Sequence, residues 1–553
     1  MTISADRLPQ ETQNTSGYPS ILIITALVAI TPSLWWILLD QTAWPWDQAW
    51  YGEVSADLWS TLTWRTADWP SEMLSAQSPK APGLAWLGQF FVPLGELLGS
   101  VELGLMLLIL LLQCGSLLLM GSLGRALAPR SVWVPLAGVL AMASAPLFIA
   151  MSQQFLTEAF QCFAITYFYW IGARSQQRHP FETLTHLVLA TGLAVAAKTT
   201  SPLYFFLPAC LALGNAIVAL YGPPSPASKP RPSRTVLIVG AAGTAFLLAI
   251  AAWYLVNFTA VWDFVKLAST GDAALDYGHR SAFIPKLEFW TRQTTISLAT
   301  QWTSWIIIAI ILAGAIARFD RSHATPNESR NRDLLALAAL AHIMLVLFLF
   351  SFQINEETRY LLPLLPAVAV LLMWSLTQPP LSKPGAAPVA FFVLAAQWGL
   401  VHARAHDLIA PTPTINAWVK PYDSDSENRI EIENLVNLTS TKQTHRRYNI
   451  CGVELPWLNA NTLAFFAAKQ EARLGFRAMY TSLGYATKDI TMAWSRLNSL
   501  NINYYISITA DKQPTANFIN EASLPVLMRI TEDPRFSQVL FPSRRHIIVY
   551  QKQ

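Results

Sequence analysis

The chain has 553 residues, of which 53% are hydrophobic and only 13% are charged, and its formal net charge is +4. The apolar residues gather in blocks of about 20, the length that crosses about 30 Å of hydrocarbon. This composition indicates a polytopic α-helical membrane protein. The basic residues lie in short loops rather than on one face, so the net charge gives no reason to expect nucleic acid as a partner.

The sequence predicts about eleven membrane-spanning helices. They are expected near residues 20 to 39, 101 to 122, 132 to 151, 155 to 173, 184 to 198, 201 to 220, 235 to 256, 298 to 317, 334 to 352, 360 to 377 and 388 to 403. One of the two helices that flank Lys198-Thr199-Thr200 is short, and a single broken helix is the alternative interpretation of this pair.

Residues 1–19 are polar, and the apolar stretch that follows is too long for a signal peptide and lacks a small-residue cleavage site. We therefore expect a cytoplasmic N-terminal tail and a retained first helix in the plasma (inner) membrane. With this orientation the loops rich in Arg and Lys are cytoplasmic, as the positive-inside rule requires. Outside the membrane are then the loops 40–100, 152–154, 257–297 and 353–359 and the chain after about residue 404.

The composition divides the chain into a transmembrane domain (20–404) and an extracytoplasmic α/β domain (405–553). In the second domain the patterns predict strands at 448–453, 503–508 and 546–550 and helices at 461–474 and 491–500. Segment 221–234 is proline-rich and is predicted to be an extended cytoplasmic linker. Three cysteines lie in apolar spans and Cys451 stands alone in the tail, so neither a disulfide framework nor a thiolate metal site is indicated.

The first outer loop (40–100) interleaves tryptophans with acids, which is typical of an interfacial helix. An aromatic belt with solvated acids is one interpretation. The other is a site around Asp47, whose tryptophan neighbours would limit water and raise its basicity. Lys80 lies between Pro79 and Pro82, where its ammonium could pair with a lipid phosphate or serve as an interfacial anchor.

Further ionisable residues are predicted at the outer ends of other spans. Glu158 and Lys198 are either charged residues that are stabilised by their position at a helix end, or site residues that face a polar cavity. The long loop 257–297 carries Arg280 and Arg292, whose guanidinium groups suit phosphate oxygens but also suit a surface. Arg359 and Tyr360 run into a helix with two prolines, which indicates either a helix deformed near a cavity or a packing kink.

Four separated motifs then resemble the lipid-sugar-dependent glycosyltransferases of the protein O-mannosyltransferase and aminoarabinose transferase superfamily, which have the GT-C fold. Asp47-Gln48-Ala49-Trp50-Tyr51-Gly52-Glu53 resembles the first-loop Asp-Glu motif, and Lys80-Ala81-Pro82 resembles Lys-Pro-Pro. Leu156-Thr157-Glu158-Ala159 resembles Leu-Thr-Asp-Ala, and Arg359-Tyr360 with Pro363 and Pro366 resembles Arg-Tyr-Leu-Leu-Pro. Ala197-Lys198-Thr199 is similar to a further Thr-Lys-Gly segment. The likeness covers roughly residues 20 to 400, and the chain departs from the pattern at Gln48 and Ala81.

This resemblance implies an inverting transferase that moves a sugar from a polyprenyl-phosphate donor to a hydroxyl of a protein, lipid or polysaccharide outside the membrane. Asp47 would be the catalytic base and Glu158 the second acid. Lys80, Arg359, Arg280 and Arg292 are expected to bind the donor phosphate. Gln48, Tyr51, Glu53, Lys198 and Tyr360 are expected to line the cavity.

No metal ligands are predicted, although a divalent metal is possible as a cofactor because the site contains acids. Gln48 stands where the family commonly has Glu, and the missing carboxylate argues against a metal-assisted mechanism. Eleven spans with intramembrane charges would also suit a transporter or a lipid-linked oligosaccharide translocase. A catalytically silent scaffold, whose outer domain binds a partner, is a third hypothesis.

Overall fold

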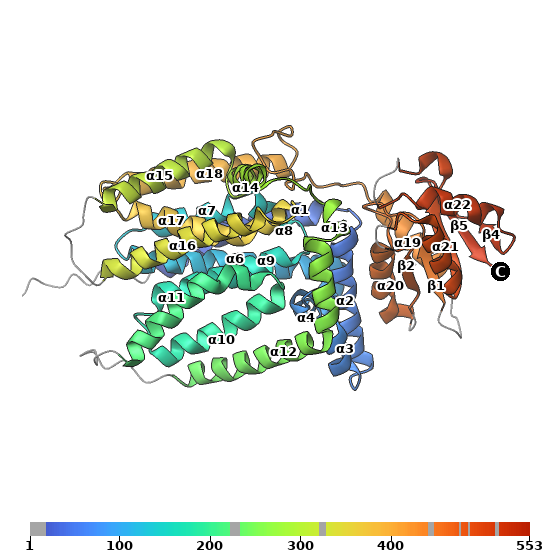
Figure 1. Cartoon of the computed structure of the whole chain (residues 1–553), viewed down its shortest axis with the longest axis horizontal. Coiled ribbons are helices and arrows are strands. Elements are labelled where there is room, and N and C mark those ends of the chain that lie inside the picture. The colour runs from blue at the N-terminus through green and yellow to red at the C-terminus, as the bar shows by residue number, and fades with distance from the viewer. Residues whose placement is uncertain are drawn as a thin grey trace, which may run out of the picture.

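The computed structural model describes residues 18–221, 233–319, 328–440, 447–474, 477–484, 487–514 and 519–553. These residues form a bundle of long helices with a small α/β domain at one end, built from the C-terminal part of the chain (Figure 1). The predicted tail (1–19) and the proline-rich linker (221–234) lie almost entirely outside the described residues.

Nine helices in the described part of the chain are long and apolar enough to cross a membrane. They are α1 (Tyr18–Leu39), α6 (Val101–Leu127), α10 (Pro180–Ala197), α11 (Ser201–Tyr221), α12 (Arg234–Ser269), α15 (Gln301–Phe319), α16 (Glu328–Phe350), η2 with α17 (Thr358–Leu364 and Leu365–Leu376) and α18 (Ala386–Ala405). The predicted multi-pass membrane architecture is confirmed.

The predicted span 132–151 is a bent pair, α7 (Trp133–Ala143) and α8 (Pro146–Ser152), whose axes differ by 62°. Pro146 opens α8 after an extended Ala145, because proline cannot continue the hydrogen bonding of the preceding helix. Counting this pair as one span gives ten candidates. The eleventh predicted span is α9 (Thr157–Arg174), which is not among them.

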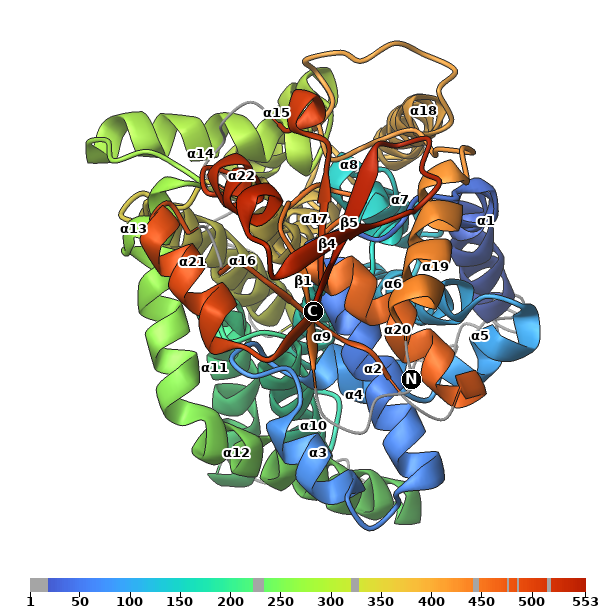
Figure 2. The same ribbon diagram turned by 90° about the vertical axis from the view of Figure 1, so that its right-hand side faces the viewer.

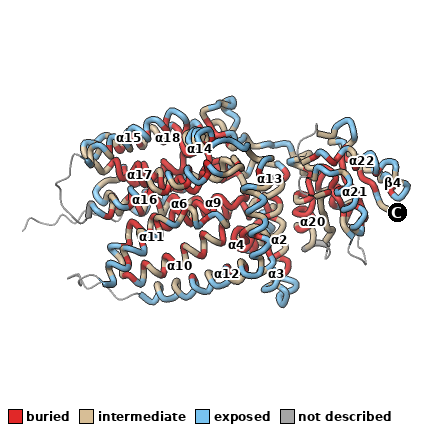
Figure 3. Tube along the Cα trace, in the orientation of Figure 1, coloured by how far each residue is buried: buried red, intermediate tan, exposed pale blue. Residues whose placement is uncertain are grey.

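Helix α9 lies in the middle of the bundle, and most of its side chains are buried by neighbouring helices (Figure 3). It does not need a lipid-facing surface, which explains why it carries Glu158, Gln161 and Thr166. By contrast, α12 and α15 on the outside of the bundle expose apolar side chains, as contact with lipid requires.

The two spans predicted around Lys198 are present, and one other helix boundary needs correction. Helices α10 and α11 are separate antiparallel neighbours joined at residues 198–200, so the single broken helix is excluded. Helix α12 has 36 residues rather than the predicted span of 235–256, and at 1.5 Å per residue it is about 54 Å long. The segment expected as a long loop therefore contains the end of α12, α13 (Asp272–Leu275) and α14 (Phe283–Ser297).

The first outer loop folds into one long helix, α2 (Trp46–Trp64), and three short ones, α3 (Trp69–Ser75), α4 (Gly83–Gly88) and α5 (Val92–Leu98). Helix α2 lies across the end of the bundle, between it and the C-terminal domain (Figure 1). The sequence predicts an interfacial helix with several tryptophans in this segment, and α2 lies at the corresponding position.

The C-terminal domain has a five-stranded sheet in the order β2-β1-β3-β5-β4. Strands β1 (Tyr448–Cys451), β2 (Met479–Ser482) and β3 (Ile502–Ile508) are parallel, whereas β5 (Ile547–Lys552) and β4 (Phe536–Val539) are added antiparallel. Its helices are α19 (Glu427–Thr439), α20 (Ala460–Leu474), α21 (Ile490–Ser499) and α22 (Ser523–Glu532). The predicted α/β class is correct, while β2, β4, α19 and α22 carried too weak a pattern to be predicted.

Figure 2 views the molecule from the side of this domain, which covers part of the bundle end. Helix α20 packs along α2. Arg477 pairs with Glu53 and Asp57 of α2, and Lys469 Nζ lies 2.5 Å from Glu102 Oε1 at the start of α6. These ion pairs fix the domain against the membrane part. The four cysteines have free thiols.

We expect Gly83 to be required for the position of the segment that carries Lys80. An added Cβ at Gly83 would lie 2.5 Å from the carbonyl oxygen of Ala196, at the end of α10. Since backbone would have to move, Gly83→Ala should destabilise the protein by about 1–3 kcal/mol and lower its melting temperature in detergent. Gly399→Ala in α18 is the control, because nothing lies within 4 Å of its added Cβ. Equal melting temperatures for the two variants would contradict the packing argument.

Candidate active site

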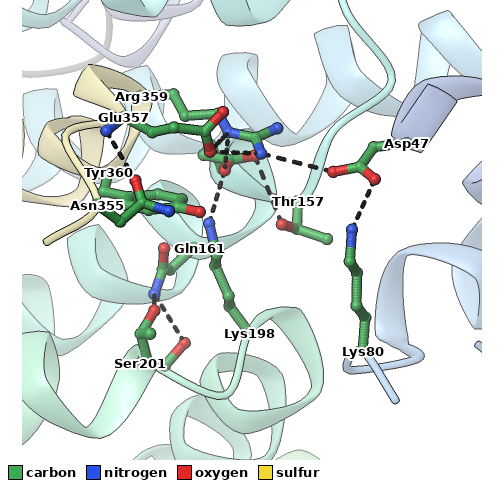
Figure 4. A network of polar contacts seen from close by, with 12 residues as sticks. Asp47, Lys80, Thr157, Gln161, Lys198, Ser201, Asn355, Glu357, Arg359 and Tyr360 are labelled. Atoms are coloured by element: carbon green, nitrogen blue, oxygen red, sulfur yellow. Dashed lines mark hydrogen bonds and ion pairs between the residues drawn. The ribbon is translucent and has the colours of Figure 1, made fainter. Parts of the chain in front are cut away.

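Asp47 lies in the first turn of α2, where the bundle meets the C-terminal domain. Its Oδ1 is 2.6 Å from Lys80 Nζ, which reaches it from the segment between α3 and α4 (Figure 4). Burial raises the pKa of the Asp47 carboxyl, but the positive charges of Lys80 and Arg359 outweigh that effect and hold the pKa well below its ordinary value. The side chain keeps 30% of its surface exposed, so a ligand can approach it.

Arg359 connects three carboxylates at the start of the η2–α17 span. Its Nη2 is 3.5 Å from Asp47 Oδ2 and 2.7 Å from Glu357 Oε2, and its Nε is 3.4 Å from Glu158 Oε1. Only 13% of the Arg359 side chain is exposed. A guanidinium with several donors in one plane suits this arrangement, which a lysine at the same position could not reproduce.

Glu158 is almost fully buried at the start of α9 and binds a second lysine. Lys198 Nζ, just after α10, donates to Glu158 Oε1 at 2.6 Å and lies 4.1 Å from the centre of the Tyr360 ring. The adjoining Gln161 amide donates to Ser201 Oγ at 3.1 Å (Figure 4). We call Asp47, Lys80, Glu158, Lys198, Glu357 and Arg359 the charge cluster; it has three formal negative and three formal positive charges.

Aromatic rings surround the Lys80 side of the charge cluster. Lys80 Nζ lies 5.2 Å from the centre of the Trp50 ring and 5.5 Å from that of Phe264 on α12. Tyr51 and Gln48 are buried in α2. Burial, together with the nearby charges of Asp47 and Glu158, raises the pKa of the Tyr51 hydroxyl well above its ordinary value, so this hydroxyl is neutral near pH 7. The rings limit water around the ammonium and strengthen its attraction for an anion.

Two further residues hold the start of α2 in an uncommon backbone conformation. Trp46, which precedes Asp47, has a φ of 26°, a region that bulky residues rarely adopt. Its indole donates to Glu454 Oε2 at 3.1 Å, and its carbonyl accepts a hydrogen bond from Asn461 Nδ2 at 3.3 Å. Both partners belong to the C-terminal domain, which therefore takes part in setting the position of Asp47.

The structure brings most of the predicted site residues together, but not all. Asp47, Lys80, Glu158, Lys198, Arg359 and Tyr360 meet in or beside the charge cluster, with Gln48 and Tyr51 on the same helix. Glu53 points elsewhere and pairs with Arg477, because six positions along a helix place it on another face than Asp47. Arg280 and Arg292 are exposed on the segment after α12 and on α14, so their role in phosphate binding stays a prediction.

Sequence reasoning did not assign a role to Glu357, Glu454 or Arg477. Glu357 was visible, since it stands two residues before Arg359 in the same motif. The other two contact α2 from more than 400 residues away in the chain, and no local pattern reveals such a contact.

The described residues contain no group of three or more His, Cys, Asp or Glu side chains that could hold a metal ion. Around Asp47 both carboxylate oxygens face cations, and the next residue is Gln48. This donor set does not fit a resident divalent metal, and we derive no step through one.

No protein-family model and no curated protein sequence matches the chain. Among solved structures, the chain is similar to ArnT from Cupriavidus metallidurans bound to undecaprenyl phosphate, with a TM-score of 0.53, 13% identity, and coverage of 97% of this chain and 98% of that one. It is also similar to the archaeal oligosaccharyltransferase AglB from Archaeoglobus fulgidus in complex with an inhibitory peptide and a dolichol-phosphate, with a TM-score of 0.52, 10% identity, and coverage of 98% and 75%. The GT-C fold that the sequence motifs implied is thereby confirmed.

We expect the stability of the junction between α2 and the C-terminal domain to depend on pH because of Glu454. Burial raises the pKa of its carboxyl from 4.5 to about 7 although Trp46 donates to it. The folded chain therefore binds a proton that the unfolded chain has released between these two values, and stability falls as pH rises through that window. Glu454→Gln removes this ionisation. The free energy of unfolding of the variant, relative to that of the wild type, should therefore be about 1–3 kcal/mol more favourable to the folded state at pH 8 than at pH 5.

The melting temperature in detergent, measured from pH 5 to 8, tests this expectation. Glu532→Gln, at an exposed carboxyl of the same domain, is the control and should follow the wild type. A difference between Glu454→Gln and wild type that stays constant over this range would contradict the pKa argument.

Proposed function

We propose that the protein is a membrane glycosyltransferase that moves a sugar from a polyprenyl-phosphate donor to an acceptor hydroxyl. The main support for this proposal is the charge cluster, in which a partly exposed carboxylate, Asp47, lies between Lys80 and Arg359 at one end of a membrane bundle. The fold is shared with structures that contain undecaprenyl phosphate and dolichol-phosphate, which supports a donor of this class. The acceptor is a protein, a lipid or a polysaccharide.

The donor phosphate competes with Asp47 for its cations. Lys80 and Arg359 satisfy the Asp47 carboxylate while no other anion is near, and this pairing makes Asp47 a weak base. A phosphate that approaches Lys80 takes over part of these contacts, because its oxygens accept charge-assisted hydrogen bonds from both side chains. Asp47 then loses cationic partners, its basicity rises, and it can accept a proton.

The reaction follows as a single displacement. The acceptor oxygen attacks the anomeric carbon while the bond from that carbon to the phosphate oxygen breaks. The acceptor proton passes to Asp47, and the electron pair of the broken bond stays on the lipid phosphate, where Lys80 and Arg359 stabilise the negative charge. One displacement inverts the configuration at the anomeric carbon.

Glu158 and Lys198 position Arg359 rather than contact the donor in this proposal. Glu158 is 1% exposed and bound to Lys198, so it is less open to a ligand than Asp47. Removing either partner would leave an uncompensated buried charge beside Arg359. We therefore assign proton transfer to Asp47 and orientation of the guanidinium to Glu158, which refines the earlier expectation of two catalytic acids.

The orientation in the membrane supports an outer-face site. Basic residues lie at the ends of α6, α9 and α15 and at the starts of α12 and α16, and these helix ends are at the end of the bundle opposite to α2 and the C-terminal domain (Figure 1). By the positive-inside rule, this distribution supports a charge cluster and a C-terminal domain outside the plasma membrane and an N-terminus inside.

Asp47→Asn is expected to lower sugar transfer by about a hundred- to ten-thousand-fold, the usual contribution of a positioned base. Binding of undecaprenyl phosphate should not weaken and should become tighter, because the competing carboxylate charge is gone. Transfer is measured with membranes that contain a radiolabelled lipid-linked sugar, and binding with purified protein.

Asp263→Asn is the matched control for this variant, since Asp263 is exposed on the outer part of α12. It should keep transfer and binding. If Asp47→Asn retained full transfer, or if it abolished lipid phosphate binding, the assigned role of Asp47 would be wrong. A carrier or translocase would instead keep its transport in Asp47→Asn.

Lys80→Met should have the opposite effect on binding. It removes the ammonium beside Asp47 while keeping most of the unbranched side chain, so the affinity for undecaprenyl phosphate should fall by about tenfold or more. Lys266→Met, at an exposed lysine of α12, is the control and should bind like the wild type. Equal affinity of Lys80→Met and Lys266→Met would refute the proposed phosphate site.

A further inference from the structure

A cavity lies on the other side of the molecule from α12, between the end of α1, the start of α6 and helix α19 of the C-terminal domain. Figure 2 shows these elements on the opposite side from α12, which contributes Phe264 to the surroundings of Lys80. The cavity volume is about 260 Å³. This exceeds the roughly 30 Å³ of one water several-fold and approaches the lower limit of ligand pockets, about 300 Å³.

Gln153 gives this cavity the character of a binding site. This residue lines the cavity and is 5% exposed, yet among the described residues neither its amide nitrogen nor its amide oxygen has a hydrogen-bond partner. A buried amide without partners costs about 1–3 kcal/mol. A ligand that reached this amide from the cavity would satisfy both a donor and an acceptor.

The charges in the cavity favour a ligand that donates hydrogen bonds. Glu102 is already neutralised by Lys469 and lies 3.5 Å from Arg429. Asp40 accepts hydrogen bonds from Thr42 Oγ1 and from the backbone of Asp423, but it forms no ion pair with a described residue. An uncompensated carboxylate attracts hydroxyl or ammonium groups and repels phosphate.

The apolar part of the lining belongs to two membrane-spanning helices. Trp36, Ile37 and Leu38 form the last turn of α1, and Leu103 and Met106 lie in the first two turns of α6. Polar groups therefore occupy the side of the C-terminal domain, and apolar groups continue toward the bilayer. An amphipathic molecule fits this division, with its headgroup in the cavity and its chain along the helices.

We propose that this cavity binds the polar headgroup of a bilayer lipid that carries hydroxyl or amine donors, such as a sugar headgroup. The site is distinct from the charge cluster around Asp47 and does not depend on the proposed reaction. Gln153 and Asp40 receive the headgroup, and the ends of α1 and α6 receive the first part of the chain.

The test uses full-length protein in phosphatidylcholine nanodiscs and an octyl β-glucoside that carries a diazirine in its alkyl chain. After irradiation, labelled peptides should map to the segments around residues 36–42 and 100–106. Gln153→Met should reduce this labelling by about fivefold or more, because it removes both amide partners of the headgroup. It should also raise or preserve the melting temperature, since an unpaired buried amide is replaced by an apolar group of similar shape.

Two further variants and one competitor complete the experiment. Gln301→Met, at an exposed residue at the start of α15, should label like the wild type, and Lys80→Met should also leave this labelling unchanged. Leu103→Trp, which fills the apolar part of the cavity, should abolish it. Unchanged labelling in Gln153→Met, or label spread evenly over the lipid-facing helices, would overturn the proposal. Equal competition by free glucose would overturn the assignment to a lipid.

Discussion

The site depends on one constraint: charges that leave water must be paired. Arg359 contacts Asp47, Glu158 and Glu357, and these residues come from α2, α9 and the segment before η2. Isolated burial of any one of these charges would cost several kcal/mol, so each side chain fixes the place of the others. The same constraint makes the cluster responsive. An incoming anion redistributes the contacts of Lys80 and Arg359, and a carboxylate that loses cationic partners becomes a stronger base.

Helix α2 links this cluster to the C-terminal domain, because one of its faces contacts the cluster and another contacts the domain. Asp47 faces the cations of the membrane bundle, whereas Glu53 and Asp57 face Arg477 of the outer domain. Gly52 lets the ring of Phe465 approach closely, because a Cβ there would lie 2.9 Å from it. The domain is therefore part of the scaffold of the site. A shift of the domain would be transmitted to the strained start of the helix, one residue before Asp47.

The sequence supports the helical membrane architecture and most of the charge cluster, because hydropathy and short motifs are local signals. Asp47, Lys80, Glu158 and Arg359 could be predicted to share one face of the membrane, since Asp47 and Lys80 lie in the first outer loop and Glu158 and Arg359 lie at the outer ends of predicted spans. The burial of α9 could not be predicted as clearly, because its composition is shaped by neighbouring helices rather than by lipid. Glu53 was misplaced because the position of Arg477 was unknown. The weak edge elements of the outer domain, β2 and β4, have only four residues each, too few for a periodic pattern.

The cavity between α1, α6 and α19 lies close along the chain to the charge cluster. Trp44 lines this cavity and lies three residues before Asp47, a separation of at most about 11 Å along the backbone. Its ring stacks between Phe155 of the segment that leads to Glu158 and Phe465 of the outer domain, with centroid distances of 5.6 and 5.2 Å. Close-packed interiors transmit strain between neighbouring side chains. We therefore expect a headgroup that displaced Trp44 to disturb the position of Asp47 as well.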